Sequence, residues 1–277
     1  MILCKYLDSK GYLDIINNQR LLATDPTTFN DPFEMYPGII GKPDKDKTLR
    51  YLLNDFLTRL SSATKVAEPD FKGEFVLRDE DAFSKKVEQN MKPGLEREVK
   101  NGLERASQTM RMICFCDPKE IKDGDDILLW SHYGDKHKGV RIFFETDDIK
   151  ILSTNLFQVV YSLERACIDI TDLSASTFNK NVEDAYLNTF KTKNKSWEYE
   201  KEIRWIINLQ ECIQEDGRSY IPLSPKAIRR IDLGCKCKSE KVIPLLKEYG
   251  NAYQHIKLYE ALVHEHRYSL KYKEIDL

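Results

Sequence analysis

The sequence lacks several features that would assign a chain of 277 residues to a class at once. Its formal net charge is only −2, which argues against a protein that binds nucleic acid mainly by electrostatic attraction. No apolar run approaches the roughly 18–20 residues that span a bilayer. The start, MILCKYLDSKGYL, has one lysine and then acidic residues, unlike a secretory signal. We therefore expect a cytoplasmic protein with no membrane partner.

The chain has too few suitably spaced cysteines to predict a disulfide framework or a zinc site. It has seven cysteines, an odd count. Closely spaced Cys and His residues occur at Cys114/Cys116, Cys235/Cys237 and His264/His266. Structural zinc sites usually have two to four residues between their cysteines. The CFC segment is instead typical of a strand, in which alternate side chains point the same way and pack together. We expect no metal and no prosthetic group.

Three nucleotide and hydrolase signatures are also missing. There is no Walker A loop, no G-x-G-x-x-G and no G-x-S-x-G elbow. These absences argue against P-loop, Rossmann and α/β-hydrolase proteins. Hydrophobic residues make up 41% of the chain and charged residues 32%, which indicates a globular protein with a highly charged surface.

The opening of the chain predicts strand, helix and strand. The strands are Ile2–Leu7 and Leu21–Thr24, and the helix between them is Ser9–Asn17. Ser9 is a suitable N-cap, and Leu13 and Ile16 are expected on the buried face. A loop rich in turn-forming residues follows.

Residues 43–110 differ from the rest of the chain in being rich in Lys, Glu and Asp. Helical periodicity occurs around Leu49–Leu60 and again around Phe83–Met110, where Pro93–Gly94 interrupts it. We expect a helical insertion at 43–110 within a single domain, 1–277. A solvated helical subdomain and a lid are both compatible with this composition.

The remaining elements alternate between short strands and helices. Strands are predicted at Met112–Cys116, Val140–Glu145, Phe157–Ser162, Glu202–Leu209 and Arg230–Leu233. Helices are predicted at Asp125–Tyr133, 178–194, Ser224–Pro225 onward and Ser239–Tyr249, with a closing hairpin at 255–274. The chain has no repeats and no low-complexity tract. This order predicts an α+β fold with a mixed, mainly antiparallel sheet and a helical insertion.

The first candidate site segment is FNDPFE, residues 29–34. Asn30 and Asp31 can hydrogen-bond their own backbone, and Pro32 stiffens the turn. Glu34 would then be held beside the opening strands. A rigid connecting turn and a ligand-binding loop explain this segment equally well.

The second segment is WSHYGDKHKG, residues 130–139. Trp130 and Tyr133 supply planar surfaces for a ligand. Histidine can donate or accept a proton near neutral pH, which makes His132 a candidate acid or base. Ser131 is a weak nucleophile unless a base activates it. The two glycines permit unusual backbone angles or close approach of a ligand.

The third segment is KSWEYEKEIRWII, residues 195–207. If residues 200–204 are extended, Glu200, Glu202 and Arg204 project to one face. An exposed charged ladder of this kind contributes little. Trp197 and Trp205 flank the acids, however, and such large aromatics predict partial burial. A half-buried acid pair beside arginine suits glycosidic-bond chemistry, in which a carboxylate stabilises an oxocarbenium-like centre.

Several segments, in their order, resemble the bacterial family of unknown function numbered 2971. They are CKYLDSKGYLDIINNQRLLATDPTTFNDPFE, ICFCDPKE, LLWSHYGDKHKGVRIFFE, VVY, KTKNKSWEYEKEIRWII and IPLSPKAIRRIDLG. Together they cover most of the chain outside 43–110. After the CF pair the family usually has serine, where this chain has Cys116. The resemblance implies gene neighbours in phage defence and mobile elements.

The order of elements also resembles that of ADP-ribosyltransferases at the level of the fold. That resemblance implies NAD as substrate, bound in a split, mostly antiparallel sheet. It places Tyr6 on the first strand, Tyr133 or His132 in the middle, and Glu200 or Glu202 on the late strand. The first strand reads Lys-Tyr, where the better-known classes have His or Arg.

Three functions stay open from the sequence. The first is an enzyme that cleaves a nucleoside-type glycosidic bond, with NAD the favoured substrate and a protein or nucleic acid as a possible target. Glu202 or Glu200 would stabilise the ribosyl cation, Arg204 would order that carboxylate, and Tyr133 or Trp130 would stack on a ring. The second is a non-catalytic module of a defence or stress system that binds a nucleotide or a protein. The third is a metal-dependent nuclease that uses Asp31, Glu34, Glu200 and Glu202.

Overall fold

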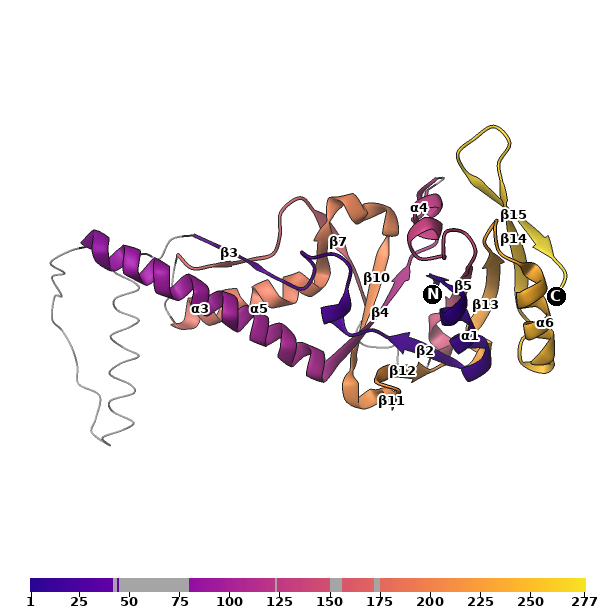
Figure 1. The fold of residues 1–277 in the computed structure, drawn as a ribbon, viewed down its shortest axis with the longest axis horizontal. Coiled ribbons are helices and arrows are strands. Elements are labelled where there is room, and N and C mark those ends of the chain that lie inside the picture. Colours follow the sequence, from indigo (N-terminus) through magenta and orange to yellow (C-terminus); the bar gives the residue numbers. More distant parts are fainter. Residues whose placement is uncertain (42–43, 45–79, 123, 150–155, 172–174) are drawn as a thin grey trace. The chain divides into compact units, whose positions relative to one another are not determined.

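The computed structural model describes residues 1–41, 44, 80–122, 124–149, 156–171 and 175–277 (Figure 1). The chain divides into two units. The first comprises residues 1–29, 106–163 and 193–277, and the second comprises 30–105 and 164–192. Whether they act as one domain with an insertion at 43–110 stays a prediction. The helix expected around Leu49–Leu60 lies outside the described residues.

The first unit is built on an eight-stranded sheet. In spatial order its strands are β15 (Leu270–Ile275), β14 (Lys257–Val263), β13 (Ile228–Leu233), β5 (Val140–Glu145), β1 (Ile2–Leu7), β4 (Met110–Cys116), β10 (Glu202–Asn208) and β6 (Leu156–Gln158). Neighbouring strands are antiparallel except β13 and β14, which are parallel. The predicted α+β class with a mixed, mainly antiparallel sheet is confirmed, as is the closing hairpin.

Two helices cover one face of this sheet, which carries the main hydrophobic core. They are α1 (Ser9–Asn18) and α6 (Ser239–Glu248) (Figure 1). The N-cap of α1 is Asp8 rather than Ser9, because the Asp8 carboxylate accepts a 2.7 Å hydrogen bond from the Gly11 amide. The buried face contains Tyr12, Ile15 and Ile16, whereas Leu13 is 37% exposed. The prediction for Leu13 was therefore wrong, because Tyr12 takes the buried position next to it on the helix.

Smaller elements of the first unit lie at the ends of the sheet. β2 (Arg20–Ala23), β12 (Arg218–Pro222) and β11 (Ile213–Glu215) form a three-stranded antiparallel sheet. The strand predicted at Phe157–Ser162 is split into β6 and β7 (Val160–Ser162). The split occurs where β10 begins, because the Val159 amide donates to the carbonyl of Glu202, the first residue of β10, and the backbone ladder ends there.

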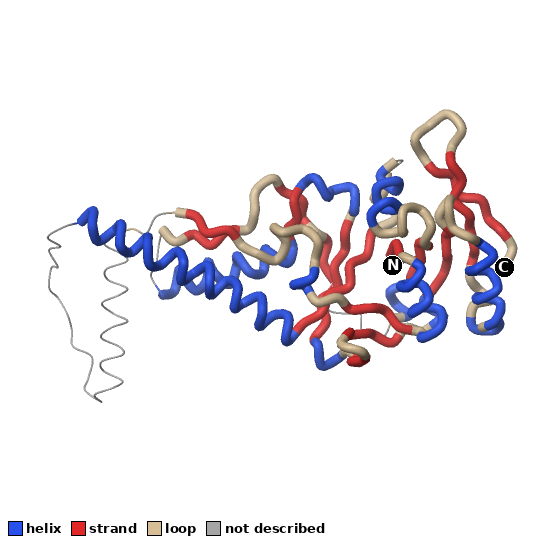
Figure 2. The backbone as a smooth tube through the Cα atoms, in the orientation of Figure 1, coloured by secondary structure: helices blue, strands red, loops and turns tan. Residues whose placement is uncertain are grey.

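Among the residues that the structure describes, the second unit contains a two-stranded parallel ladder, one whole helix and most of another, whose last residues belong to the first unit (Figure 2). These are α3 (Glu80–Thr109), α5 (Ala175–Lys191), β3 (Gly38–Ile40) and β8 (Cys167–Asp169). The Tyr186 hydroxyl of α5 donates to the Val99 carbonyl of α3 at 3.1 Å. α3 continues through Pro93–Gly94, against expectation. A proline removes one backbone donor and costs about 3 kcal/mol, which a helix of this length tolerates. The short β9 (Thr192–Asn194) spans the boundary between the units.

The second face of the large sheet is covered by α4 (Asp125–His132). A helix was predicted for this segment. Trp130 and Leu129 of this helix pack with Cys4, Tyr6 and Cys116 from the sheet. Polar and charged side chains share this face, and several of them are buried. This face therefore carries the candidate site.

Candidate functional site

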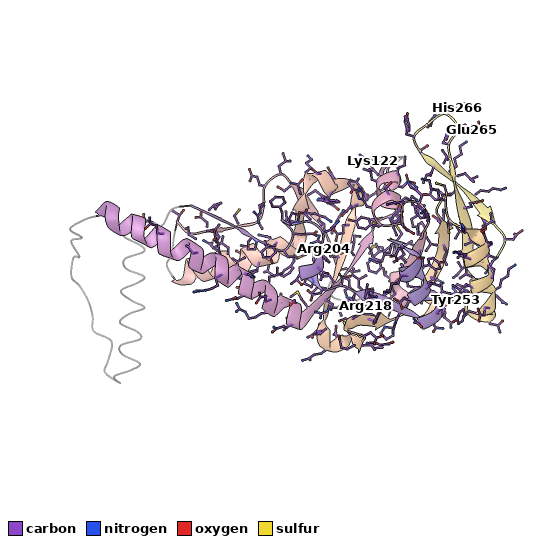
Figure 3. The ribbon with its side chains drawn as sticks, viewed as in Figure 1. Lys122, Arg204, Arg218, Tyr253, Glu265 and His266 are labelled. Atoms are coloured by element: carbon purple, nitrogen blue, oxygen red, sulfur yellow. The ribbon has the colours of Figure 1, made fainter. Side chains whose placement is uncertain are left out.

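β10 separates an apolar face from a charged one. Ile203, Trp205 and Ile207 lie in the main core, whereas Glu202 and Arg204 project to the other face. Figure 3 labels Arg204. This alternation follows from the two-residue period of a strand. Glu202 is 3% exposed and Arg204 is fully buried, so they do not form the exposed ladder that the sequence left open.

Glu200 reaches Glu202 through a bend in the chain rather than along an extended strand. It ends a 3-10 helix, Lys195–Glu200, and Lys201 follows with a left-handed φ of 45°. Lys193 joins the two acids. Its ammonium lies 2.6 Å from the Glu200 carboxylate and 3.3 Å from that of Glu202. The condition that residues 200–204 be extended is met only from Glu202 onward, because Lys201 turns the chain.

Arg204 holds Glu202 in a two-point contact. Its Nε donates to Glu202 Oε1 at 2.7 Å and its Nη2 to Glu202 Oε2 at 3.0 Å. Glu200 Oε1 accepts from the Tyr133 hydroxyl at 2.5 Å and Glu200 Oε2 accepts from Lys193. All four carboxylate oxygens thus accept hydrogen bonds. The negative charges of two buried acids and the positive charges of the buried lysine and arginine offset each other, as buried ionic groups require.

The pKa values show competition between burial and charge. Burial raises the pKa of Glu202, Lys193 lowers it, and Glu200 raises it further, so the net direction is upward. Burial lowers the pKa of Lys193, but the charges of Glu202 and Glu200 outweigh it and leave that pKa raised. The lysine therefore stays protonated as the common donor to both acids.

Tyr133 connects this acid cluster (Lys193, Glu200, Glu202 and Arg204) to a surface pocket. It follows the last residue of α4 and is partly buried. Burial and the neighbouring Glu200 charge raise its pKa, which keeps the phenol protonated as a donor. Tyr133 also lines the pocket, so one side chain contacts both features.

The pocket has a volume of about 930 Å³. Its walls come from β1, α1, β2, β12, the end of α4 and the turn that follows. Four residues predicted to contact a ligand line it: Tyr6, Ser131, His132 and Tyr133. Its basic side chains are Lys5, Lys10, Arg111, Lys136 and Arg218, and its acidic ones are Asp8, Asp14, Asp25 and Asp135.

The turn after α4 has an uncommon backbone. Asp135, Lys136 and His137 have positive φ angles of 47°, 54° and 72°. Non-glycine residues rarely adopt this conformation, and such residues cluster at functional sites. The His137 amide donates to the Trp130 carbonyl, and the His137 carbonyl accepts from the Lys236 amide at 2.9 Å. These bonds hold the turn in place.

His137 lies beside Ser131, a relation that the sequence analysis missed. Its Nε2 is 3.2 Å from the Ser131 hydroxyl, which donates to the Ile127 carbonyl at 2.7 Å. Burial and Lys236 lower the pKa of His137, with Asp126 opposing. His137 therefore favours the neutral form.

This pKa predicts that stability falls as the pH drops. An unfolded histidine gains a proton below about pH 6.5, whereas folded His137 does so only at lower pH, so the unfolded state binds more protons in between. Asparagine tolerates a left-handed backbone, which makes His137→Asn a suitable variant. Urea unfolding at about pH 7.5 and about pH 5.5 should show a larger loss for the wild type than for the variant. Equal losses would contradict the prediction.

Trp130 and Tyr6 belong to a second buried cluster, and of the two only Tyr6 also lines the pocket. Trp130 is fully buried, its ring meets Tyr6 edge-on at 5.1 Å, and its indole donates to the Tyr272 hydroxyl at 3.0 Å. The Tyr6 hydroxyl accepts from Arg141, whose guanidinium pairs with Asp232 at 2.6 Å. Trp130 thus cannot stack on a ligand here, because both its faces and its N–H are in protein contacts.

His132 and Trp197 lie at the surface near Tyr133. His132 is exposed, and its ring centroid lies 6.1 Å from that of Trp197 and 6.3 Å from that of Tyr199. The Lys193 ammonium lies 5.0 Å from the Trp197 ring centroid. These aromatics therefore cover the acid cluster from the solvent side, and His132 contacts neither acid through a hydrogen bond within the described residues.

Asn30, Asp31 and Glu34 belong to the second unit. Asn30 is exposed, whereas Asp31 and Glu34 are buried. The Asp31 carboxylate accepts from the Phe33 amide at 2.9 Å, and its carbonyl accepts from the Glu34 amide at 3.1 Å. These bonds form a turn, which was one of the two interpretations of the FNDPFE segment, and ligand binding by this loop stays a prediction.

Cys114 is a further neighbour of the two acids. The sequence analysis assigned this cysteine only to packing. It lies opposite Arg204 in the register of β4 and β10. Burial and Glu202, to which its thiol is hydrogen-bonded, raise its pKa. The Cys114 carbonyl accepts from Lys5, a pocket residue, at 2.8 Å. All seven cysteines are free.

The described residues contain neither a candidate metal centre nor a candidate membrane-spanning helix. No three His, Cys, Asp or Glu side chains there gather in a way that could hold a metal ion. This part of the chain gives the metal-dependent nuclease no support. Nor does any helix within it have the length and apolar character to cross a membrane.

Comparison with known proteins finds a similarity over part of the chain. Residues 129–205 match a family model described as "Protein of unknown function (DUF2971)". The resemblance to that family is confirmed over this segment, which contains the end of α4, Tyr133, Lys193 and the acid pair. No curated protein and no solved structure shows significant similarity to the chain.

Proposed function

We propose that the first unit binds a nucleotide-sized small molecule in the pocket beside Tyr133. The observation that carries this proposal is that Tyr133 lines the pocket while its hydroxyl is held by Glu200 at 2.5 Å. A volume of about 930 Å³ lies in the range of roughly 300–1,000 Å³ typical of ligand sites. A ring fixed in orientation can stack on a planar ligand at a low entropic cost.

The acid cluster supports a positioning role in this proposal. Every carboxylate oxygen of Glu200 and Glu202 already accepts a hydrogen bond from the protein. Both acids are also buried. The cluster is thus suited to orient Tyr133 rather than to contact a ligand directly. A role within a defence or stress system belongs to the same proposal.

A second candidate is cleavage of a nucleoside-type glycosidic bond, with NAD as the substrate. The observation that favours it is that Glu200 is hydrogen-bonded to Tyr133, a residue that lines the pocket. A rotation of Tyr133 would give a substrate access to Glu200, and the raised pKa of Glu202 suits an acid that shares a site with a second carboxylate. Transfer of ADP-ribose to a protein or nucleic acid would follow from such chemistry.

A thermal-shift series tests both candidates. Purified protein is heated with NAD, ATP, ADP-ribose or buffer alone, and the NAD sample is analysed by mass spectrometry for nicotinamide. Binding should raise the melting temperature, and the rise should grow with the logarithm of the ligand concentration once that concentration exceeds the Kd. Released nicotinamide would favour the second candidate. No shift with any nucleotide would overturn the binding proposal.

Two variants of Tyr133 distinguish the contribution of its ring to ligand binding from that of its hydroxyl. Tyr133→Phe keeps the ring, so it should keep most of the shift, whereas Tyr133→Leu should lose it. Tyr268→Leu is the control, because Tyr268 is 97% exposed and does not line the pocket. Shifts are compared with each variant's own melting temperature in buffer. Equal shifts in all three variants would contradict stacking on Tyr133.

A further inference from the structure

The acids that line the pocket are mostly engaged by the protein itself. Asp8 caps α1, Asp25 accepts from the Thr27 amide and hydroxyl, and Asp14 lies 3.1 Å from Arg20. Arg20 is not part of the pocket wall. These carboxylates therefore have little remaining capacity to bind a cation from solution.

Three of the basic side chains are in the opposite situation. Lys10, Lys136 and Arg218 are exposed, and their side chains have no hydrogen bond or ion pair to the part of the chain that the structure describes. They come from α1, the left-handed turn and β12 (Figure 3 labels Arg218). The other two cations are occupied, since Lys5 donates to a carbonyl and Arg111 donates to the Ser219 hydroxyl at 2.9 Å.

The left-handed turn adds backbone donors to the same wall. Asp135 and Lys136 both line the pocket, and within the described residues their amide N–H groups have no acceptor. Successive amides in a turn that combines right- and left-handed residues form an anion-binding concavity. Gly134, which directly precedes Asp135, does not have a positive φ, so the backbone changes hand at Asp135. The three basic side chains and the two amides of this wall are thus donors suited to oxyanions.

We propose that Lys10, Lys136 and Arg218, with the amides of Asp135 and Lys136, form a subsite for the phosphate groups of the ligand. This inference rests on the proposed binding function and specifies its ligand as a phosphate-bearing one, such as a nucleoside diphosphate. Tyr133 and Lys136 are three positions apart, so their Cα atoms lie within about 11 Å of each other. One nucleotide-sized molecule can therefore place its ring on Tyr133 and its phosphates on the turn.

The test uses three probes on the full chain. Inorganic pyrophosphate reports on the subsite alone, adenosine on the ring-binding surface alone, and ADP-ribose on both. Isothermal titration calorimetry gives the Kd of each. Lys136→Gln and Arg218→Gln should each weaken pyrophosphate and ADP-ribose by about tenfold, as loss of one charge-assisted contact implies, and leave adenosine unchanged. The pyrophosphate Kd should also rise with ionic strength.

Matched control variants are available on the same unit. Lys122 and Arg267 are exposed and do not line the pocket. Lys122→Gln and Arg267→Gln change the net charge equally and should leave every Kd within about twofold of the wild type.

The outcomes separate this inference from the proposed function. Binding of adenosine without binding of pyrophosphate would overturn the phosphate subsite and leave the ligand-binding module intact. Binding of pyrophosphate without adenosine or ADP-ribose would support the subsite and overturn the nucleotide module. Equal losses in the pocket and control variants would overturn the assignment to these residues. No binding of any probe would overturn both.

Discussion

Replacing Glu202 with glutamine should lower the free energy of unfolding by about 3–5 kcal/mol. The change keeps the shape of the side chain but removes one of two negative charges that offset the buried ammonium of Lys193 and the buried guanidinium of Arg204. Breaking a buried ion pair on one side costs more than the pair itself contributes, because the remaining charge was already transferred out of water. Urea unfolding, followed by circular dichroism, measures the loss.

The matched control is Glu198→Gln, four residues earlier. Glu198 is 48% exposed at its side chain and pairs with Lys201 at 3.6 Å, so its loss should cost at most about 1 kcal/mol. Equal effects of the two changes would contradict the structural role of the acid cluster. A Glu202→Gln protein of wild-type stability that no longer releases nicotinamide from NAD would favour the catalytic candidate instead.

The second large effect is expected for Gly139→Ala. A Cβ atom at this position would lie 2.0 Å from the carbonyl oxygen of Leu7, which belongs to the backbone of β1 and cannot rotate away. The Gly139 amide and carbonyl are also fixed by hydrogen bonds to Gly134 and Gly234 at 2.9 and 3.0 Å. We expect a loss of about 3 kcal/mol, at the upper end of the usual range for overpacking. Thermal and urea unfolding measure it.

A glycine with open surroundings provides a control of opposite sign. Gly94 lies inside α3, and a Cβ there would meet nothing within 4 Å. Gly94→Ala should raise the free energy of unfolding by about 0.5–1 kcal/mol, because alanine favours the helix and restricts the unfolded chain. Similar effects of the two alanine substitutions would show that close approach does not limit Gly139.

Local patterns in the sequence were sufficient to predict most of the large sheet. Val140, Ile142 and Phe144 share the core face of β5, and Ile203, Trp205 and Ile207 that of β10, because a two-residue period is visible in any single strand. The charged face of Glu202 and Arg204 follows from the same period. Register and strand order, in contrast, depend on pairs far apart in the chain, which a single sequence does not reveal.

The missed parts of the site involve contacts between distant elements. Lys193 lies in an unremarkable KTKN stretch, and only the bend at Lys201 brings both acids to it. Tyr133 and Glu200 are 67 positions apart. No local sequence pattern indicates that Tyr133 and Glu200 are in contact, because each of them could equally occupy a solvated surface position.

The two glycines in the turn at residues 134–139 were expected to permit either unusual backbone angles or the close approach of a ligand. Gly134 and Gly139 indicated an unusual backbone, yet the positive φ angles fall on Asp135, Lys136 and His137. The glycines serve close packing instead, since a Cβ on Gly134 would meet the Trp130 ring at 2.5 Å. Glycine frequency alone does not distinguish these two needs.

The two-faced character of β10 also bears on how the chain avoids misfolding. A slip of one residue against β4 would turn Glu202 and Arg204 into the apolar core and Trp205 onto the charged face. Both charges would then lose their partners in a medium that solvates neither, so the mispaired state is disfavoured on each side of the strand at once. The acid cluster thus helps to specify the register of β10 against β4. This role would persist in a variant that binds no ligand.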